Sequence, residues 1–352
     1  SRDLRRQGRA MLDAVVRDVA RSGRRRVVTL LGPGARVPAG WRGVEVVRAA
    51  PDALAAAFDA AAARADDAWV IAPETGDALA VWSERAAACG AHLLGAAPDA
   101  VRAVADKLTL AARLAAAGLR VPPSLEVHEE AGVATGAVVA GGSGGERGAA
   151  AERGRGDVRG FPLVVKPSPG AGCEGVRLVR TRTELARAVR AARRTGAARV
   201  IVQPYVRGVP ASALLLCAGD GRVVPLSLNG QRVVPGRPFR YRGGVVPLRH
   251  AAAEPALEAA CRACALWPGL RGIVGADLVL AESGPCVIEV NPRVTMSYLG
   301  LRAVARGNPA DWVLDLAEGG ALPRPPALRG TARFSETGTV RVTGGRAVPA
   351  HG

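Results

Sequence analysis

Residues 272–293 read GIVGADLVLAESGPCVIEVNPR, and this stretch says most about the fold. Polar and apolar residues alternate in two runs that meet near Gly284, a pattern that predicts a β-hairpin. With the turn centred on Gly284, Asp277 falls opposite Asn291 and diagonal to Glu289. One face of the hairpin then carries Asp277, Glu289, Asn291 and Arg293, and the other carries Leu278, Leu280, Ile288 and Val290.

The polar face of this hairpin has the chemistry of a metal and phosphate site. Two carboxylates and a carboxamide oxygen are hard ligands, which suit Mg²⁺ bridging the phosphates of ATP. Arg293 would neutralise a phosphoryl group during its transfer, which gives this residue a catalytic role. The alternative interpretation is an ordinary polar strand face in contact with solvent.

Only two of the 48 basic residues are lysines, and both lie in settings typical of phosphate binding. Lys107 opens a predicted helix, and Lys166 ends an apolar strand immediately before a glycine-rich loop. The compact ammonium group of lysine suits polyphosphate oxygens in a tight pocket better than the wide guanidinium fork. We therefore predict that the two lysines converge on one nucleotide; alternatively, they are the remnant of a general bias toward arginine.

The loop after Lys166 contains Gly170, Gly172 and Gly175 in the spacing G-x-G-x-x-G. A strand precedes the loop, and residues 176–180 alternate like a second strand, where a dinucleotide-binding motif requires a helix. The pattern therefore predicts a hairpin lid whose backbone N–H groups approach phosphates. An ordinary glycine-rich hairpin is the alternative.

Residues 199–208 read RVIVQPYVRG, an apolar strand that runs into a short hinge. Such a hinge can hold adenine by backbone hydrogen bonds, with the amide of Gln203 offered to the base. Taken by itself, the segment is better interpreted as a core strand.

The composition is that of a globular protein with two or three domains. The chain has 352 residues, 49% of them hydrophobic, and no apolar run approaches the roughly 18 residues of a membrane span. Six scattered cysteines and the lack of a visible secretory signal indicate a reduced, cytoplasmic setting. A net charge of +17 raises the remote alternative of a basic nucleic-acid-binding protein, but dispersed arginines and 3% aromatic residues argue against it.

The order of predicted elements gives the domain organisation. Helices at 9–20, 52–64 and 76–89 alternate with strands at 27–31, 44–47, 68–72 and 92–94. This alternation predicts a parallel sheet flanked by helices, and the first helix lies so near Ser1 that the chain is expected to begin inside the fold. One helix is expected at 98–118, and further helices at 183–194 and 255–266 lie among strands and hairpins of an α+β region.

We predict four parts. They are an α/β domain at 1–105, an α+β lobe at 106–205 with a flexible insertion at 129–160, a second α+β lobe at 206–325, and a tail at 326–352 that forms a loosely attached strand or two. The insertion is assigned from its Gly, Ala, Arg and Glu content and its lack of periodicity.

The motifs appear in the order found in the ATP-grasp superfamily, which residues 90–315 resemble. They are Asp106-Lys107, Lys166 with its glycine loop, Gln203-Pro-Tyr-Val206, and Asp277 followed by Glu289-Val-Asn-Pro-Arg293. The resemblance implies a pre-ATP-grasp domain and two lobes that clamp ATP with Mg²⁺ or Mn²⁺. It also implies that Lys107 and Lys166 contact phosphates, that Gln203, Tyr205 and Val206 hold adenine, and that Asp277, Glu289 and Asn291 bind metal. Ser212 stands near the position where many members carry an acidic ribose ligand.

Within the superfamily, four segments resemble the tyramine–glutamate ligases of methanofuran biosynthesis. These segments are Gly8-Arg-Ala-Met-Leu12, Ala72-Pro-Glu74, Tyr241-Arg-Gly-Gly244 and Asn291–Tyr298. The resemblance implies that a glutamate γ-carboxylate is activated as an acyl phosphate and attacked by an amine, with release of ADP. Another carboxylate–amine ligase, such as a peptide or amino-acid ligase, would share the ATP-binding residues.

The same resemblance implies a substrate site made of Glu74, Arg240, Arg242 and Tyr298. Arg240 and Arg242 would bind the α-carboxylate of glutamate, and Tyr298 would stack on an aromatic amine. Alternatively, the two arginines belong to the general surplus and Tyr298 is a core residue. The expected partners are the small-molecule acid and amine, with a homodimer as the expected assembly and neither nucleic acid nor membrane as a partner.

Overall fold

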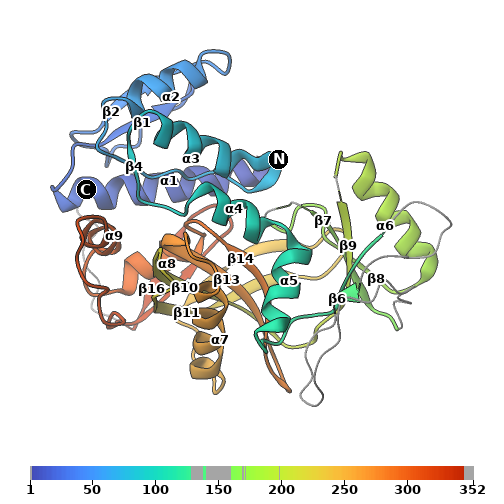
Figure 1. The fold of residues 1–352 in the computed structure, drawn as a ribbon. Coiled ribbons are helices and arrows are strands. Elements are labelled where there is room, and N and C mark those ends of the chain that lie inside the picture. The colour runs from blue at the N-terminus through green and yellow to red at the C-terminus, as the bar shows by residue number, and fades with distance from the viewer. Residues whose placement is uncertain are drawn as a thin grey trace.

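The computed structural model describes residues 2–127, 138–139, 160–168, 170, 172–197 and 199–344. In chain order it forms an N-terminal unit and two lobes, each lobe built on its own β-sheet (Figure 1). The insertion predicted at 129–160 lies almost wholly outside the described residues. No helix in the described part of the chain is both long and apolar enough to cross a membrane.

The N-terminal unit contains α1 (Arg2–Ser22), β1 (Val28–Leu31), β2 (Glu45–Arg48), α2 (Leu54–Ala62), β3 (Asp67–Ala68), α3 (Ala78–Ala88) and β4 (His92–Leu93). All four strands pair in parallel, as predicted, but in two separate pairs, β1 with β2 and β3 with β4. The strand predicted at 68–72 is shorter than expected. Beyond Ala68, Trp69 and Ile71 pack against one hydrophobic core and Val70 and Ala72 against another.

The prediction that a helix opens at Lys107 is confirmed, whereas the prediction of one helix across 98–118 is wrong, because two helices occupy this region. They are α4 (Pro98–Ala105) and α5 (Lys107–Ala116). Asp106 between them has an extended backbone, and its side chain accepts hydrogen bonds from the backbone N–H groups of Leu108 and Thr109 at 3.0 and 3.1 Å. This N-cap satisfies donors that a helix start otherwise leaves unpaired, so α5 begins at Lys107.

The first lobe is a five-stranded sheet covered on one face by a helix. Its elements are β5 (Ser124–Glu126), β6 (Val138–Val139), β7 (Leu163–Ser168), β8 (Arg177–Val179), α6 (Arg182–Arg194) and β9 (Arg199–Pro204), with strand order β6-β5-β9-β7-β8. Leu163 and Val165 of β7 are fully buried in the cluster that includes Ala188 and Ala192 of α6. Strand alternation therefore turns Val164 and Lys166 toward the opposite face.

The second lobe is a seven-stranded antiparallel sheet with strand order β14-β13-β10-β11-β12-β15-β16. Its elements are β10 (Val209–Ala218), β11 (Val223–Val234), β12 (Arg240–Val246), α7 (Ala253–Ala265), β13 (Arg271–Ala281), β14 (Gly284–Asn291), α8 (Ser297–Val304), α9 (Pro309–Ala317), β15 (Thr331–Phe334) and β16 (Val340–Thr343). Helices α6 and α7 confirm the helices predicted at 183–194 and 255–266, with bounds that differ by at most two residues.

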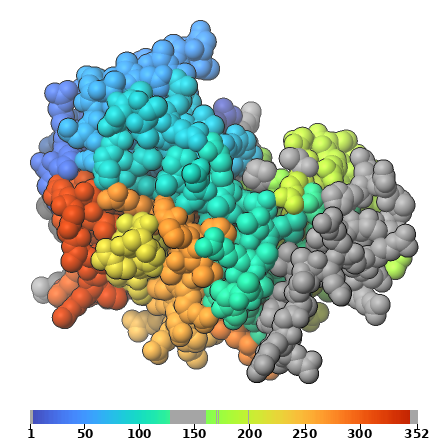
Figure 2. All heavy atoms as spheres, viewed as in Figure 1, coloured from blue at the N-terminus to red at the C-terminus, as the bar shows by residue number. Residues whose placement is uncertain are grey.

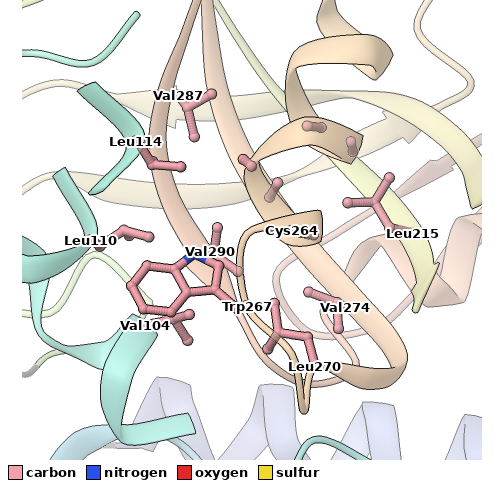
Figure 3. Close-up of a cluster of buried hydrophobic side chains, with 14 of the residues drawn as sticks. Val104, Leu110, Leu114, Leu215, Cys264, Trp267, Leu270, Val274, Val287 and Val290 are labelled. Atoms are coloured by element: carbon pink, nitrogen blue, oxygen red, sulfur yellow. The ribbon is translucent and has the colours of Figure 1, made fainter. Parts of the chain in front are cut away.

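Both faces of the seven-stranded sheet are buried, as consecutive leucines of β10 demonstrate. Leu215 points into a core shared with α7, α4 and α5, where Leu110, Leu114 and Trp267 meet (Figure 3). Leu214 and Leu216 point into a second core, which is shared with α1, α8 and α9. Because successive strand residues alternate between faces, an uninterrupted apolar run is required here.

The prediction of a loosely attached tail after residue 325 is wrong for residues 331–343. Strand β15 pairs with β12, and β16 pairs with β15, so both extend the seven-stranded sheet. Ala332 and Phe334 are buried in the same core as α1 and α8, with exposed fractions of 0% and 3%. The tail does form strands, as predicted, but they belong to the sheet and are not loosely attached.

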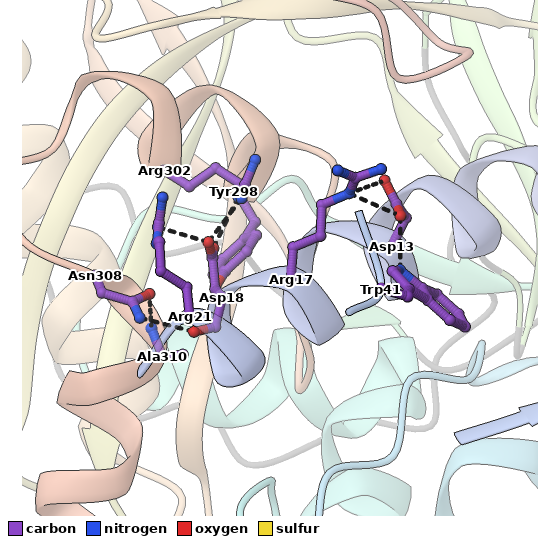
Figure 4. Close-up of polar contacts among 9 residues, drawn as sticks. All are labelled: Asp13, Arg17, Asp18, Arg21, Trp41, Tyr298, Arg302, Asn308 and Ala310. Carbon is purple, nitrogen blue, oxygen red and sulfur yellow. Dashed lines mark hydrogen bonds and ion pairs between the residues drawn. The ribbon is translucent and has the colours of Figure 1, made fainter. Parts of the chain in front are cut away.

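Helix α1 is joined to the second lobe through the buried carboxylate of Asp18 (Figure 4). Tyr298 donates its hydroxyl to Asp18 Oδ2 at 2.9 Å, and Arg302 Nη2 donates to Oδ1 at 2.7 Å. Asn308 donates its side-chain amide to the backbone carbonyl of Asp18 at 2.8 Å. In the space-filling view the N-terminal unit accordingly lies directly against the C-terminal helices (Figure 2).

The two lobes are bridged by backbone hydrogen bonds between β8 and the β11–β12 loop. Leu178 N donates to Gly236 O, and Phe239 N donates to Val176 O, both at 2.8 Å. An ion pair of 2.6 Å between Arg237 and Glu184 of α6 lies beside them. We refer to these contacts together as the interlobe bridge.

Candidate active site between the lobes

A cavity between the lobes gathers most of the residues predicted to bind nucleotide and metal. From the predicted set it is lined by Lys107, Lys166, Gly170, Gly172, Gln203, Tyr205, Val206, Asp277, Glu289, Asn291 and Arg293. All three units contribute to its wall, because Ile71 and residues of α1 also line it.

The register of the β13–β14 hairpin differs from the prediction. The turn lies at Glu282–Ser283, since Ala281 pairs with Gly284, and Asp277 pairs with Glu289 instead of Asn291. A β-bulge between Asp277 and Leu278 leaves Ile288 without a cross-strand partner. Without that extra residue Asp277 would face Ile288, so the bulge is what brings Glu289 beside Asp277. Ile288, predicted for the apolar face, lines the cavity.

The pKa values of the paired carboxylates of Asp277 and Glu289 are shifted in opposite directions. Burial raises the pKa of Asp277 to about 6, with Glu289 adding to the shift, although hydrogen bonds from Gln231 and Asn291 oppose it. Burial also acts to raise the pKa of Glu289, but Lys107 and Lys166 outweigh it and hold that pKa below its usual value. Desolvation is thus the main reason for the raised pKa of Asp277, and the charge of Glu289 is the second.

The two lysines converge on Glu289. Lys107 Nζ lies 2.6 Å from Glu289 Oε1 and 3.4 Å from the carbonyl oxygen of Gly170 in the lid loop. Burial lowers the pKa of Lys166, and Glu289 partly counteracts that effect. Two ammonium groups beside one carboxylate leave positive charge available to phosphate oxygens.

Arg293 is held by a residue of the N-terminal unit. Its Nη2 lies 2.9 Å from Glu74 Oε2, with side chains only 10% and 6% exposed. Among the described residues, Glu74 Oε1 and Arg293 Nε have no hydrogen-bond partner. Glu74 was predicted to contact substrate; its carboxylate instead lies on Arg293 and is absent from the cavity lining. It positions the guanidinium group.

The glycine loop is a hairpin, as predicted, because β7 and β8 on either side of it pair antiparallel. Gly172 has φ +63°, and a Cβ there would lie 2.7 Å from Leu4 Cδ2 of α1, so the loop approaches α1 closely. Gly175 has φ +73° and lies outside the cavity lining. Its role is therefore the backbone turn, for which glycine has the lowest conformational cost.

The hinge residues line the cavity with part of their hydrogen-bonding capacity already used. Gln203 donates its side-chain amide to Ser124 Oγ at 2.6 Å, which leaves its Oε1 for a ligand. Tyr205 donates its backbone N–H to Pro162 O at 3.0 Å. Ser212, predicted near the ribose, is buried with its hydroxyl 3.2 Å from Ser297 Oγ and does not line the cavity.

The predicted substrate residues of β12 and α8 do not reach the cavity. Strand alternation turns Tyr241 into the cavity and leaves Arg240 and Arg242 exposed, with Arg242 paired to Glu336 at 3.1 Å. Tyr298 is fully buried in the core and bound to Asp18. The stacking role predicted for Tyr298 is therefore wrong, and the alternative of a core residue holds.

Several lining residues carried no predicted role. Gln231 Nε2 donates to Asp277 Oδ1 at 2.8 Å and so orients a carboxylate on the polar face of the β13–β14 hairpin. Phe239 before β12, Tyr241 of β12, Met296, and Gln7, Gly8 and Met11 of α1 also line the cavity. Tyr241 could have been found if the residues of β12 that face the cavity had been assigned correctly. Nothing local in the sequence marks Gln231.

Comparison with known proteins agrees with this geometry. The family model for the ATP-grasp domain matches residues 104–297, and that for the pre-ATP-grasp domain matches residues 26–101. The chain therefore belongs to the ATP-grasp family. Its architecture is a pre-ATP-grasp unit followed by the two lobes of the ATP-grasp fold.

Curated relatives match only part of the chain. A tyramine–L-glutamate ligase from Methanocaldococcus jannaschii is 32% identical over 102 residues, which are 29% of this chain and 32% of that protein. A D-alanine–D-alanine ligase from Gloeobacter violaceus is 35% identical over 159 residues, 41% of this chain and 50% of that protein. The matches thus span from a third to a half of these relatives.

A solved structure matches nearly the whole fold. The biotin carboxylase domain of the Hydrogenobacter thermophilus 2-oxoglutarate carboxylase, in complex with MgADP, has a TM-score of 0.72 at 14% identity. The match covers 92% of this chain and 71% of that chain. At this identity the similarity concerns the fold alone.

Proposed function

We propose that this protein is an ATP-dependent ligase that joins a carboxylate to an amine through an acyl phosphate and releases ADP. The observation that carries the proposal is the meeting of Lys107, Lys166 and Arg293 with Asp277 and Glu289 in one cavity. Three cations beside two carboxylates suit a polyphosphate together with a divalent cation.

Asp277, Glu289 and Asn291 would hold Mg²⁺ or Mn²⁺, which supplies neutralising charge to the phosphates. The donor set fits, because it consists of hard oxygen ligands and the carboxylates of Asp277 and Glu289 lie opposite each other on paired strands. Lys107 and Lys166 bind phosphate oxygens, and Arg293 stabilises charge that develops on the γ-phosphoryl group. Gln203, Tyr205 and Val206 hold adenine at the hinge.

The reaction proceeds in two steps. A carboxylate oxygen attacks the γ-phosphorus and ADP leaves, and the amine nitrogen then attacks the acyl carbon and inorganic phosphate leaves with loss of one proton. Pairing to Glu74 keeps the Arg293 guanidinium in place through both steps. Closing the cavity beneath the glycine loop excludes water, which would otherwise hydrolyse the acyl phosphate.

We further propose that the acid is glutamate, activated at its γ-carboxylate, and that the amine is tyramine or a tyrosine-like amine. The similarity to tyramine–L-glutamate ligases supports this choice and a place in methanofuran- or methylofuran-type cofactor biosynthesis. The second candidate is a ligase of two amino acids, supported by the match to a D-alanine–D-alanine ligase. The predicted homodimer stays a prediction.

The direct test is to supply Mg-ATP with candidate acids and amines and to identify the products. Glutamate with tyramine should give ADP, phosphate and an amide, and hydroxylamine in place of the amine should give a γ-glutamyl hydroxamate. AMP and pyrophosphate would contradict the acyl-phosphate route. A preference for small amino acids in both positions would favour the second candidate.

Lys166→Met should lower the rate of ADP formation by a factor on the order of 10²–10³, because it removes a preorganised cation from the phosphates. Lys166→Arg should fail similarly, since the wide fork cannot replace a point charge. Arg222→Met is the matched control, because Arg222 is 63% exposed and pairs only with Asp220. Full activity of both Lys166 variants would show that this lysine does not bind the phosphates.

A further inference from the structure

One stripe of α1 forms a wall of the cavity. Leu4, Gln7, Gly8 and Met11 all line it, at the i, i+3, i+4 and i+7 spacing of a single helix face. No side chain of this stripe is charged, although its neighbours along the helix include Arg5, Arg6 and Arg9. The charged lining residues come instead from the lobes, around Lys107 and Arg293. The cavity therefore has a charged end and an uncharged wall.

Gly8 makes a notch in this wall. A Cβ placed on Gly8 would meet no atom within 4 Å. Close packing therefore does not require glycine here, in contrast to Gly300, where a Cβ would lie 2.6 Å from Val246 Cγ2. Glycine is also among the poorest residues for a helix interior. Gly8 therefore leaves open space beside the helix, within reach of the cavity.

Gln7 adds a polar group next to the notch. Its side chain is only 9% exposed and lines the cavity, yet its amide makes no hydrogen bond within the described parts of the chain. Its Oε1 would lie 3.7 Å from a Cβ on Gly172, so it faces the lid loop. Buried amides in proteins are normally hydrogen-bonded. An unpartnered amide at this position is suited to a ligand.

The surroundings of the notch are apolar. Met11 and Met296 belong to one hydrophobic cluster, Ile71 and Tyr241 pack against it, and all four line the cavity. A charged group placed against such a wall would lose hydration without gaining a partner. The α-carboxylate of an amino-acid substrate is therefore expected near Arg293, and the apolar part of a substrate near α1.

We propose that the Gln7–Gly8–Met11 face of α1 is the binding site for the amine substrate and selects primary amines that carry an aromatic or bulky apolar group. This inference rests on the ligase function proposed above. The notch accommodates the apolar body, and the Gln7 carbonyl accepts a hydrogen bond from an N–H or O–H group of the amine. Gln7 and Gly8 act on specificity and have no part in the phosphoryl transfer.

The test is Gly8→Leu, with Gly8→Ala as the matched control. Leucine fills the notch, whereas alanine adds one carbon for which there is room, and both are better helix formers than glycine. Gly8→Leu should form γ-glutamyl hydroxamate from ATP, glutamate and hydroxylamine at a rate within about twofold of the unsubstituted protein. Its KM for tyramine should rise about tenfold or more, as for the loss of a few methylene-sized contacts. Methylamine should be affected much less.

Each outcome decides between the proposals. Equal losses of hydroxamate and amide formation in Gly8→Leu would overturn the amine assignment while leaving the ligase function in place. An unchanged KM for tyramine would overturn it as well. No hydroxamate from the unsubstituted protein would overturn the ligase function and the amine site with it. Thermal unfolding of both variants at or above the temperature of the parent excludes a folding defect.

Discussion

Tyr298 and Asp18 form a fully buried polar contact between the two ends of this chain. The phenol donates to the carboxylate, and Arg302 and Arg21 supply the compensating positive charge. Burial raises the pKa of Tyr298 well above its usual value, and the neighbouring Asp18 carboxylate raises it further. The folded protein therefore keeps the phenol protonated at pH values at which the unfolded chain ionises.

We expect Tyr298→Phe to lower the free energy of unfolding at neutral pH by about 1–3 kcal/mol, the contribution of a hydrogen bond to a charged group. The KM values for ATP and both substrates should not change, because Tyr298 does not line the cavity. Chemical denaturation and steady-state kinetics check the two statements. A raised KM for the amine with unchanged stability would restore the stacking role.

The same pair predicts an alkaline effect. The pKa of Tyr298 in the folded protein lies above the value near 10 of the unfolded chain. The Tyr298 hydroxyl therefore contributes fully to the free energy of unfolding below about pH 10, and this contribution is lost as the pH rises further. The stability difference between the parent and Tyr298→Phe should therefore shrink above pH 10. Burial also raises the pKa of Tyr241, but this residue is present in both proteins, so its effect on stability cancels in the difference.

The chemistry of the site was more predictable at this scale than its geometry. Two lysines in an arginine-rich chain, and two carboxylates with an asparagine on one hairpin, are chemically distinctive, and the structure gathers them. Arg240 and Arg242 were misassigned because strand phase, which a short polar segment leaves undetermined, decides which side chains face inward. Gln231 contacts Asp277 across the sheet, and such pairing depends on register alone.

At the level of elements, the start of α5 determines where Lys107 lies. Asp106 accepts two backbone N–H groups of the first turn, and its other oxygen lies 2.7 Å from Arg199. The start of a helix at Lys107 was predicted, but the end of α4 at Ala105 was missed, because Ala, Asp and Lys are all tolerated inside helices. Capping is recognisable only when the backbone leaves the helical conformation.

Asp106→Ala should lower stability by about 1 kcal/mol, the usual loss on removing an N-cap, and should raise the KM for ATP as Lys107 loses its anchored position. Asp106→Asn is the matched control. It keeps a capping oxygen and loses only a partly exposed ion pair, which typically contributes between about 0 and 1 kcal/mol. Urea denaturation and ATP kinetics should separate the two variants; equal effects on both would mean that the ion pair, and not the cap, matters.

The tail strands illustrate why the place of an element in the fold escapes prediction even where the element itself is expected. Residues 331–334 read TARF and residues 340–343 read VRVT, each short and half polar. Their stabilisation comes from pairing with β12 and from burial of Ala332 and Phe334, contacts between distant parts of the chain. Local propensity cannot report such contacts, whereas long periodic helices such as α6 were found nearly to the residue.

For the whole molecule, the interlobe bridge links the lid side of the first lobe to the second lobe. Amide exchange at Leu178 and Phe239 should slow on addition of Mg-ATP, since both amides bond across the two lobes and a nucleotide between the lobes should hold them together. Ile201, in the centre of its sheet, is the internal reference and should not respond. Nucleotide-independent exchange at Leu178 and Phe239 would mean that the bridge is static.

A variant isolates the contribution of the ion pair. Arg237→Ala removes the partner of Glu184 and should speed exchange at both amides about 1.5- to 5-fold, as expected for a partly exposed pair. Arg222→Ala, which removes a pair far from the bridge, should leave these amides unchanged.

The contact between Asp18 and Arg302 has a consequence for biosynthesis. The two residues are 284 positions apart, so at typical translation rates roughly 15 to 60 s pass between their synthesis. During that interval Met11 and Val15 of α1 lack the core that α8 and α9 later complete. The N-terminal unit therefore finishes assembling only after the C-terminal helices have been made, and a nascent chain interrupted before α8 presents the uncovered apolar face of α1 to chaperones and proteases.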